Sequence, residues 1–172
     1  IPDADLFKEI KSGHASVVTD TIDTFTETGI KLSYGQELKA DIVVSATGLD
    51  LQFLGGAEVK VDGETIDLAK RLTYKGTMYE GVPNMVSIFG YTNASWTLKC
   101  DLTCEFTCRL IKRMDKTGAH AVTPRNVSPD IETTPWLDFS SGYVQRTIDR
   151  FPKQGNRKPW KLNQNYAADL LM

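Results

Sequence analysis

The 172-residue chain has no uninterrupted apolar run close to the roughly 20 residues that a membrane-spanning helix needs. It opens without the charged and apolar regions of a signal peptide. The composition has no bias toward disorder, and 41% apolar residues are enough to build one core. The sequence therefore predicts a globular protein without an integral membrane segment, and a cytoplasmic location as the default.

An excess of charge of either sign is also missing, because 20 basic and 22 acidic residues leave a formal net charge of -2. No basic stripe marks a surface for nucleic acid. Basic and aromatic residues do interleave within 67–83, but acidic residues balance them. We expect a solvated loop there rather than a stacking surface for nucleic acid.

Histidine is scarce, and neither of the two histidines has the partners that catalysis needs. His14 and His120 lie beside glycines, and no Ser, Cys or Asp is spaced from them as in a catalytic pair. We therefore expect both at the surface. HExxH, GxSxG and P-loop patterns are absent. Hydrolase and phosphoryl-transfer functions therefore have no local support, whereas chemistry carried by a bound cofactor remains compatible with the chain.

The three cysteines, Cys100, Cys104 and Cys108, recur every fourth residue and so lie on one side of a predicted helix. A site for a soft metal is conceivable. However, neither a His nor a further Cys lies nearby to complete a tetrahedron. Because the cysteines continue an apolar arc that includes Ile111, we predict core residues, with no disulfide and no metal site.

One apolar segment ends in small residues, namely Asp41-Ile42-Val43-Val44-Ser45-Ala46-Thr47-Gly48. An uncharged run of this kind is typical of a strand that is covered on both faces of an α/β sheet. Since Ala46, Thr47 and Gly48 have little bulk, a backbone or a cofactor could approach closely there. Taken alone, the segment favours a purely structural central strand, because many such strands end in small residues.

A second apolar run, residues 85–89, ends at Gly90 and leads through residues 91–95 into a helical pattern at 96–114. The pattern predicts strand, turn and helix, with Asn93 or Ser95 as the helix cap. The free N–H groups and the positive end of the helix dipole would then face the carboxyl edge of a sheet, where open α/β folds bind ligands. An electron-rich ring or a phosphate would suit that place.

Shorter patterns predict the remaining elements. Extended segments and strands are expected at 15–20, 22–26, 30–34 and 38–46, joined by turns at 28–29 and 35–37 into an antiparallel meander. A hairpin at 58–63, a connecting loop at 118–135 and helical segments at 141–150 and 162–171 follow.

Four blocks of the chain resemble the C-terminal part of the class B flavoprotein monooxygenases, which comprise the Baeyer-Villiger monooxygenases and the flavin-containing monooxygenases. The blocks are Pro2-Asp3-Ala4-Asp5-Leu6-Phe7, the segment from Asp41 to Gly48, Gly90-Tyr91-Thr92-Asn93-Ala94-Ser95-Trp96-Thr97-Leu98-Lys99 and Gly142-Tyr143-Val144-Gln145-Arg146. The Ala-Thr-Gly block is shared widely among flavin and nicotinamide enzymes. The Tyr-Thr-Asn-Ala-Ser-Trp block is more specific and indicates the Baeyer-Villiger type.

The resemblance implies an α/β fold, the C-terminal part of a Rossmann-like FAD/NAD(P)-binding fold. Its parts would be an antiparallel meander at 1–48, a central parallel strand and a long helix within 49–117, and a C-terminal loop and helices at 118–172. It implies FAD and NADP as cofactors and a ketone or thioether that receives one oxygen atom from O2. Cofactor-binding positions would be Ala46, Thr47 and Gly48 beside the cofactor, with Asn93, Ala94 and Ser95 at the helix start facing the pyrimidine edge of the flavin.

Two features of that family are absent from the chain. The GxGxxG turns that bind FAD and NADPH do not occur, and neither does the basic active-site residue before the Pro-Asp-x-Asp stretch. We therefore expect a fragment that is inactive by itself. For Tyr91 and Trp96, shaping the substrate side and simple packing both remain open, with packing favoured.

Two other interpretations stay open. The chain could be a non-enzymatic interaction or dimerisation module that self-associates, as a homo-oligomer, through the surface that truncation exposes. It could also be a relative of the pyridine-nucleotide disulfide reductases, although Cys100 and Cys104 on one helix are a poor redox pair.

Overall fold

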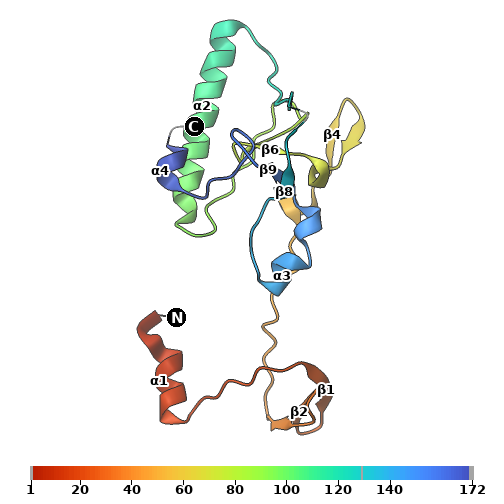
Figure 1. Cartoon of the computed structure of the whole chain (residues 1–172), viewed down its shortest axis with the longest axis vertical. Helices are drawn as coiled ribbons and strands as arrows, with labels where there is room; N and C mark the ends of the chain where they lie inside the picture. The colour runs from red at the N-terminus through yellow and green to blue at the C-terminus, as the bar shows by residue number, and fades with distance from the viewer. Residues whose placement is uncertain (1, 129, 171–172) are drawn as a thin grey trace. The chain divides into compact units, whose positions relative to one another are not determined.

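The computed structural model describes residues 2–128 and 130–170, which form a mixed α/β protein with small antiparallel sheets (Figure 1). The chain divides into two compact units, residues 1–47 and residues 48–172. Each unit is described by itself below. The division into segments 1–48, 49–117 and 118–172 stays a prediction.

The first unit combines a short helix with a three-stranded meander. Its elements are η1 (Pro2–Ala4), α1 (Asp5–Ser12), β1 (Ile22–Thr26), β2 (Gly29–Leu32) and β3 (Glu37–Lys39). The sheet order is β1-β2-β3, and both pairings are antiparallel. The predicted antiparallel meander is therefore confirmed for these three strands, whereas the segment at 15–20 forms no strand.

Polar contacts at the surface tie this meander together. The carboxylate of Glu37 accepts hydrogen bonds from the hydroxyls of Thr26 and Thr28, both at 2.6 Å. These two hydrogen bonds lower the pKa of Glu37, because they favour its charged form. Leu32 is the buried large hydrophobic residue of the sheet, so the first unit has little core of its own.

The predicted strand at 38–46 is wrong over most of its length. β3 ends at Lys39, and residues 41–47 form no strand. Ile42 and Val44 are each 83% exposed, in place of the expected burial on both faces. A strand is stable only when a neighbouring strand accepts and donates its backbone hydrogen bonds, and the described residues offer no such neighbour at 41–47.

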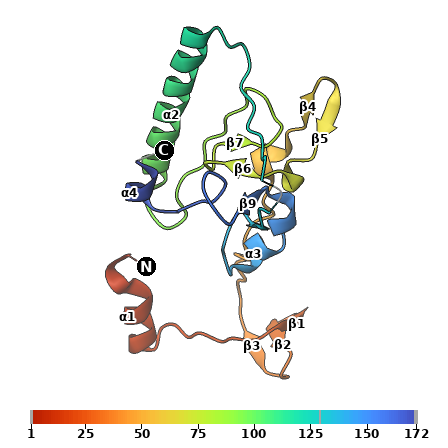
Figure 2. The ribbon, with the colours of Figure 1, turned by 45° about the horizontal axis from the view of Figure 1, so that its top comes forward.

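The second unit holds the long helix and three two-stranded sheets. Its helices are α2 (Trp96–Thr117), α3 (Gly142–Gln145), α4 (Tyr166–Asp169), η2 (Phe53–Gly56), η3 (Leu68–Lys70) and η4 (Ile148–Arg150). Its strands pair as β4 (Val59–Val61) with β5 (Glu64–Ile66), β6 (Thr73–Tyr74) with β7 (Met78–Tyr79), and β8 (Thr133–Pro135) with β9 (Lys153–Gly155). In Figure 2 the short α4 lies against the N-terminal half of α2.

Two predicted elements of this unit are confirmed. The hairpin at 58–63 is β4–β5, whose turn residues Asp62 and Gly63 have φ values of 52° and 87°, as a tight hairpin turn requires. The helix predicted at 96–114 is α2, which ends at Gly118 in a left-handed conformation. The helical segments predicted at 141–150 and 162–171 are present only as the short α3, η4 and α4 within the described residues.

A central parallel strand is not present among the described residues. Residues 85–89, expected to form it, are without strand structure, and Ile88 is 52% exposed. The parallel pairing that does occur is an isolated bridge between Leu72 and Lys153. A parallel strand needs a neighbour that is delivered by a crossover of a dozen or more residues, and nothing described here supplies one.

The core of the second unit is aromatic and centres on Phe53. Its ring lies 5.9 Å from Tyr79, 5.4 Å from Trp136 and 5.3 Å from Phe151, measured between ring centroids. Two clusters of buried residues meet through it. Burial raises the pKa of Tyr79 to about 12, and the Tyr79 hydroxyl bonds to that of Ser87.

The solvated loop predicted at 67–83 is wrong, because this stretch is the best-buried part of the unit. Thr73 and Thr77 are 0% exposed, and Met78 and Tyr79 are 1% exposed. Hydroxyl hydrogen bonds let the two threonines enter the core, since Thr73 donates to the carbonyl of Lys153 and Thr77 to that of Ser87. Charged residues interspersed along the stretch, such as Arg71 and Lys75, concealed this burial in the sequence.

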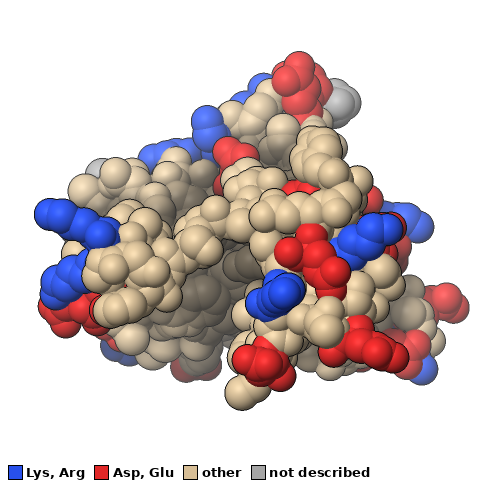
Figure 3. Space-filling model, turned by 90° about the horizontal axis from the view of Figure 1, so that it is seen from below, with Lys and Arg blue, Asp and Glu red and all other residues tan. Residues whose placement is uncertain are grey.

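The surface carries both signs of charge. On the face in Figure 3, acidic and basic side chains are interspersed, without a continuous basic stripe. A separate search of the described residues finds no helix that is both long enough and apolar enough to cross a membrane.

Candidate functional site

The loop before α2 presents three of the predicted cofactor-binding residues to solvent. Asn93, Ala94 and Ser95 are all exposed and lead directly into the helix. The predicted side-chain cap is wrong, because Ser95 occupies the cap position without capping and bonds instead to the hydroxyl of Thr97 at 3.0 Å. The first amides of a 22-residue helix therefore remain available to a ligand, together with the positive end of its dipole.

The loop is held in place by a segment about 70 residues further along the chain. The side-chain oxygen of Gln164 accepts hydrogen bonds from the backbone N–H of Thr92 at 3.1 Å and from its hydroxyl at 3.2 Å. The amide of Asn93 donates to the backbone carbonyl of Gln164 at 3.0 Å. Asn93 is thus used to fix the loop, which explains why its side chain does not cap α2.

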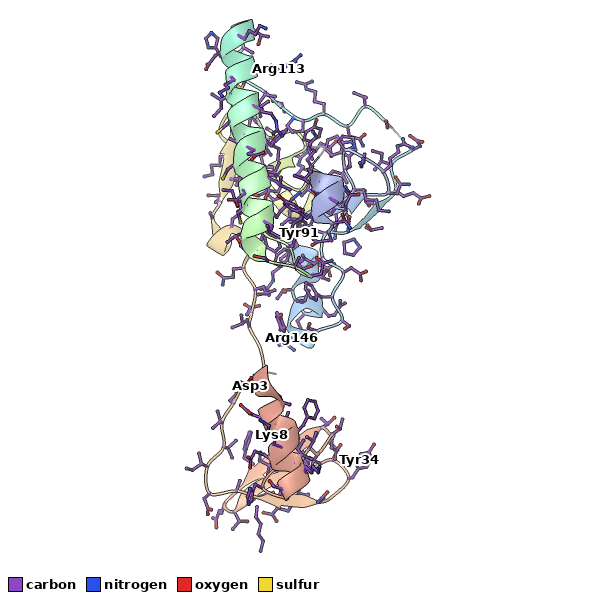
Figure 4. The ribbon with its side chains drawn as sticks, turned by 90° about the vertical axis from the view of Figure 1, so that its left-hand side faces the viewer. Asp3, Lys8, Tyr34, Tyr91, Arg113 and Arg146 are labelled. Atoms are coloured by element: carbon purple, nitrogen blue, oxygen red, sulfur yellow. The ribbon has the colours of Figure 1, made fainter. Side chains whose placement is uncertain are left out.

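A buried charged cluster anchors the first turn of α2 from the other side. The ammonium of Lys99 lies 2.9 Å from the carboxylate of Asp169, and both side chains are at most 7% exposed. The same carboxylate accepts hydrogen bonds from the hydroxyl of Tyr91 at 2.8 Å and from the amide of Asn163 at 3.2 Å. In Figure 4 Tyr91 lies at the N-terminal end of α2, well away from Arg113.

The cluster shifts the pKa values of its members in opposite directions. Burial alone would raise the pKa of Asp169, but hydrogen bonds from Lys99, Tyr91 and Asn163, with the charge of Lys99, lower it overall. Burial and then the neighbouring Asp169 raise the pKa of Tyr91. At neutral pH Asp169 is therefore ionised and the phenol of Tyr91 is neutral, and the cluster serves to position the loop.

An apolar cavity of about 570 Å3 opens beside this loop, lined in part by Tyr91, Thr92 and Trp96. Trp96 is 49% exposed and packs against Phe89, with ring centroids 4.6 Å apart. Gly90 makes this approach possible, because a Cβ there would meet the Trp96 ring at 2.2 Å. A cavity of this volume and apolar lining is within the range for a flat ring system or an organic substrate.

A second cavity of about 560 Å3 is lined by Thr92, Asn93 and Trp136, among others. The indole N–H of Trp136 is buried and has no hydrogen-bond partner among the described residues. An unpaired buried donor is uncommon in proteins and marks a place where a carbonyl oxygen would be stabilised.

The other predicted cofactor-binding residues, Ala46, Thr47 and Gly48, are exposed. Ala46 and Thr47 belong to the first unit and Gly48 to the second. Gly48 has a φ of 95°, and a Cβ at this position would meet the Cβ of Tyr143 at 2.8 Å, so the position requires glycine. The next residue, Leu49, lines the same apolar cavity as Thr92, which brings the ends of two predicted motifs to one place.

Of the aromatic residues left open by the sequence, Tyr91 borders the cavity but is mainly a packing residue, because it is 3% exposed and bound to Asp169. Trp96 lines the cavity. No pattern in the sequence marks Gln164 or Asp169, because their partners Thr92, Tyr91 and Lys99 lie 70 to 78 positions away along the chain. Lys99, at the fourth position of α2, indicates a buried acidic partner only once the structure shows that this lysine is buried.

The core prediction for the cysteines is wrong. Cys104 and Cys108 are exposed and Cys100 is half-buried, whereas α2 buries Lys99, Leu102, Thr103 and Phe106. All three thiols are free, and within residues 2–128 and 130–170 no group of His, Cys, Asp and Glu is arranged to hold a metal ion. His14 and His120 are exposed, as predicted.

Relatives of the chain cover nearly all of it. The FAD-containing monooxygenase EthA of Mycolicibacterium smegmatis is 53% identical over 171 residues, 99% of this chain and 35% of the relative. EthA of Mycobacterium tuberculosis is 51% identical over 170 residues, which are 99% of this chain and 35% of the relative. The probable FAD-binding monooxygenase AlmA of Acinetobacter baylyi is 50% identical over 98% of this chain and 34% of its own length.

The chain thus spans about a third of the length of these curated relatives. No protein-family model matches it. No solved structure matches it either.

Proposed function

Because this chain belongs to the family of FAD-containing monooxygenases, whose members it matches over about a third of their length, we propose that it forms one wall of the flavin site. One observation carries the proposal: the uncapped start of α2, with Asn93, Ala94 and Ser95 exposed, borders an apolar cavity of about 570 Å3. Uncapped amides favour the electron-rich edge of a ring, and the cavity suits its apolar body.

The residues of this chain fit part of FAD, namely its ring system. The amides at Ser95 and the first turn of α2 would face the pyrimidine edge, where they stabilise negative charge on the reduced ring. Gly48 would let the backbone pass close by. The chain has no binding motif for the pyrophosphate of FAD, because its sequence contains no GxGxxG pattern of the kind that forms such a turn.

When bound, FAD would supply the redox chemistry that activates O2, with NADPH as the source of electrons. The chain's own residues would orient and shield the ring. Gln164 and the pair of Lys99 and Asp169 hold the loop at 91–95 in one conformation. Trp96 and Phe89 close the apolar side and keep water from it. A ketone or a thioether is the substrate class that we propose for the complete enzyme.

The exposed segment at 41–47 fits the same proposal. Ile42, Val43 and Val44 would become a strand of a parallel sheet whose other strands lie in the remaining two thirds of the protein. Their present exposure of 83%, 47% and 83% is then the exposure of a strand without its neighbours. The Rossmann-like character of the complete fold is part of this proposal.

The experiment is to express the full-length protein that contains this chain and to measure bound flavin by absorbance. NADPH consumption is then followed with and without a ketone or a thioether, together with the oxygenated product. We expect a yellow protein whose substrate-dependent NADPH consumption matches product formation. A colourless protein, or one without oxygenated product, would remove the proposal. The 172-residue chain by itself should show neither flavin nor turnover.

A second proposal is self-association of the isolated chain. Phe7 is 63% exposed and Phe25 is 65% exposed, and large exposed apolar side chains drive association when they lie together. Light scattering of the isolated chain checks it: the proposal predicts a mass above that of a monomer, and a monomer at all concentrations rules it out.

A further inference from the structure

A small cavity of about 190 Å3 lies in the second unit, apart from the apolar cavity. Its charged lining consists of four lysines, Lys75, Lys99, Lys158 and Lys161, and one acid, Asp169. The carboxylate of Asp169 is already bound to Lys99 at 2.9 Å. Among the described residues the other three lysines of the lining form no ion pair, and the ammonium of Lys75 lies 5.1 Å from the centre of the Phe106 ring.

The backbone holds these lysines together. Lys75 lies in the β6–β7 turn with a φ of 53°, and its backbone N–H donates to the carbonyl of Pro159 at 2.8 Å, next to Lys158. Trp160 is 5% exposed and packs edge-on against Tyr74 with ring centroids 5.6 Å apart. Flexible side chains could turn away from one another, but the segments that carry them cannot separate without losing these contacts.

The pKa of Lys75 is shifted in the direction expected for a lysine that has positive charges nearby and no acid to balance them. Burial lowers the pKa of Lys75, and the neighbouring charges of Arg109, Lys158 and Lys99 lower it further. The ion pairs within residues 2–128 and 130–170 include none from Lys75, Lys158 or Lys161. Like charges gathered in a cavity repel one another, and an anion bound between them would relieve that repulsion.

We propose that this cavity binds a small oxyanion, with phosphate as the chemistry that fits best. Lysine ammonium groups bind phosphate as point charges. The volume of about 190 Å3 exceeds the roughly 30 Å3 of one water several-fold, yet it is below the range of organic cofactor sites. The anion is either free phosphate or the phosphate group of a nucleotide that extends into solvent.

Titration calorimetry of the full-length protein tests the inference, with inorganic phosphate and AMP as probes at low and at high salt. The test variants are Lys158→Gln, Lys161→Gln and the double variant, because both side chains belong to exposed residues and their loss should not disturb folding. Lys112→Gln, which removes one exposed ammonium group of α2 outside this cavity, is the matched control. Thermal unfolding verifies that all variants are folded.

We expect saturable phosphate binding with a dissociation constant of about 1 mM or below, weakened about tenfold by the double variant and by added salt. The control should bind like the unmodified protein. Tighter binding of AMP than of phosphate assigns the site to a nucleotide, and equal or weaker binding assigns it to the free ion. Absence of saturable binding of both probes, or equal weakening by Lys112→Gln, would overturn the inference, whatever the flavin content of the protein.

Discussion

The segments 41–48 and 90–95 have similar patterns in sequence, but the structure fixes only the second through contacts to distant residues. Each includes or directly follows an apolar run, contains small residues that are exposed, and is predicted to approach a flavin. In the first, Ile42 and Val44 are 83% exposed. In the second, Tyr91 is 3% exposed and bound to Asp169.

The difference shows what fixes each conformation. The second segment is fixed by contacts to residues 163–169, which belong to the same compact unit. The first forms no ladder with any described strand. An apolar run therefore indicates a surface to be buried, but it does not identify the partner, and the partner decides whether a strand forms.

The largest expected effect comes from the anchor of the second segment. Asp169→Ala removes the carboxylate that the buried ammonium of Lys99 and the buried hydroxyl of Tyr91 both contact. We expect a loss of about 3 to 5 kcal/mol in the free energy of unfolding, measured by urea denaturation. Asp149→Ala, at an exposed acid of the same unit, should cost less than about 0.5 kcal/mol. Equal losses for Asp169→Ala and Asp149→Ala would show that the contacts of Asp169 do not stabilise the fold.

High pH should weaken the second unit through its buried Tyr79. The pKa of Tyr79 is raised to about 12, so the folded state resists loss of this proton while the unfolded state loses it near pH 10. Stability is therefore complete below about pH 10 and falls as the pH rises toward 12, by at most about 3 kcal/mol for this group. Unfolding free energies measured across this range should fall less steeply for Tyr79→Phe. Identical slopes for the unmodified protein and for Tyr79→Phe would show that Tyr79 does not cause this loss of stability.

A smaller effect is expected where Gly90 admits the ring of Trp96. Gly90→Ala would place a Cβ 2.2 Å from that ring, so Trp96 must move away from Phe89. We expect a loss of about 1 to 3 kcal/mol and a change in tryptophan fluorescence. Gly142→Ala is the control, because its Cβ would meet nothing closer than Arg146 at 3.4 Å. An unchanged spectrum for Gly90→Ala would mean that Trp96 does not pack there.

The smallest effect on the isolated chain is expected in the first segment. Val44→Lys changes a side chain that is 83% exposed, so the free energy of unfolding of the 172-residue chain should change by less than about 0.5 kcal/mol. In the full-length protein we expect the same change to reduce folded, flavin-containing material strongly, because a lysine would enter a sheet interior. If both proteins tolerate the change, Val44 does not become buried.

The elements with local signals were predictable from the sequence. The β4–β5 turn is specified by Asp62-Gly63, and α2 by an uninterrupted run of helix formers that ends before Gly118. Each of these depends on residues that are neighbours along the chain.

What could not be predicted depends on partners far along the chain. Burial at 67–83 requires the contacts of Thr73 with Lys153, 80 positions away. The cysteines seemed apolar enough for the core, but α2 turns Leu102 and Phe106 inward and leaves Cys104 outside. The exposure of Ile42 and Val44 has the same origin, since strand formation needs hydrogen bonds from a neighbour.

The central claim is that the start of α2 faces the flavin ring, and the reduction potential of the flavin tests it most directly. Ala94→Asp places a carboxylate at this helix start, and Ala167→Asp, at an exposed position of α4, is the matched control. In the full-length protein we expect Ala94→Asp to make the midpoint potential more negative by on the order of 20 mV, because the carboxylate disfavours the reduced, electron-rich ring. The control should leave it unchanged. A potential for Ala94→Asp equal to that of the control would contradict the account.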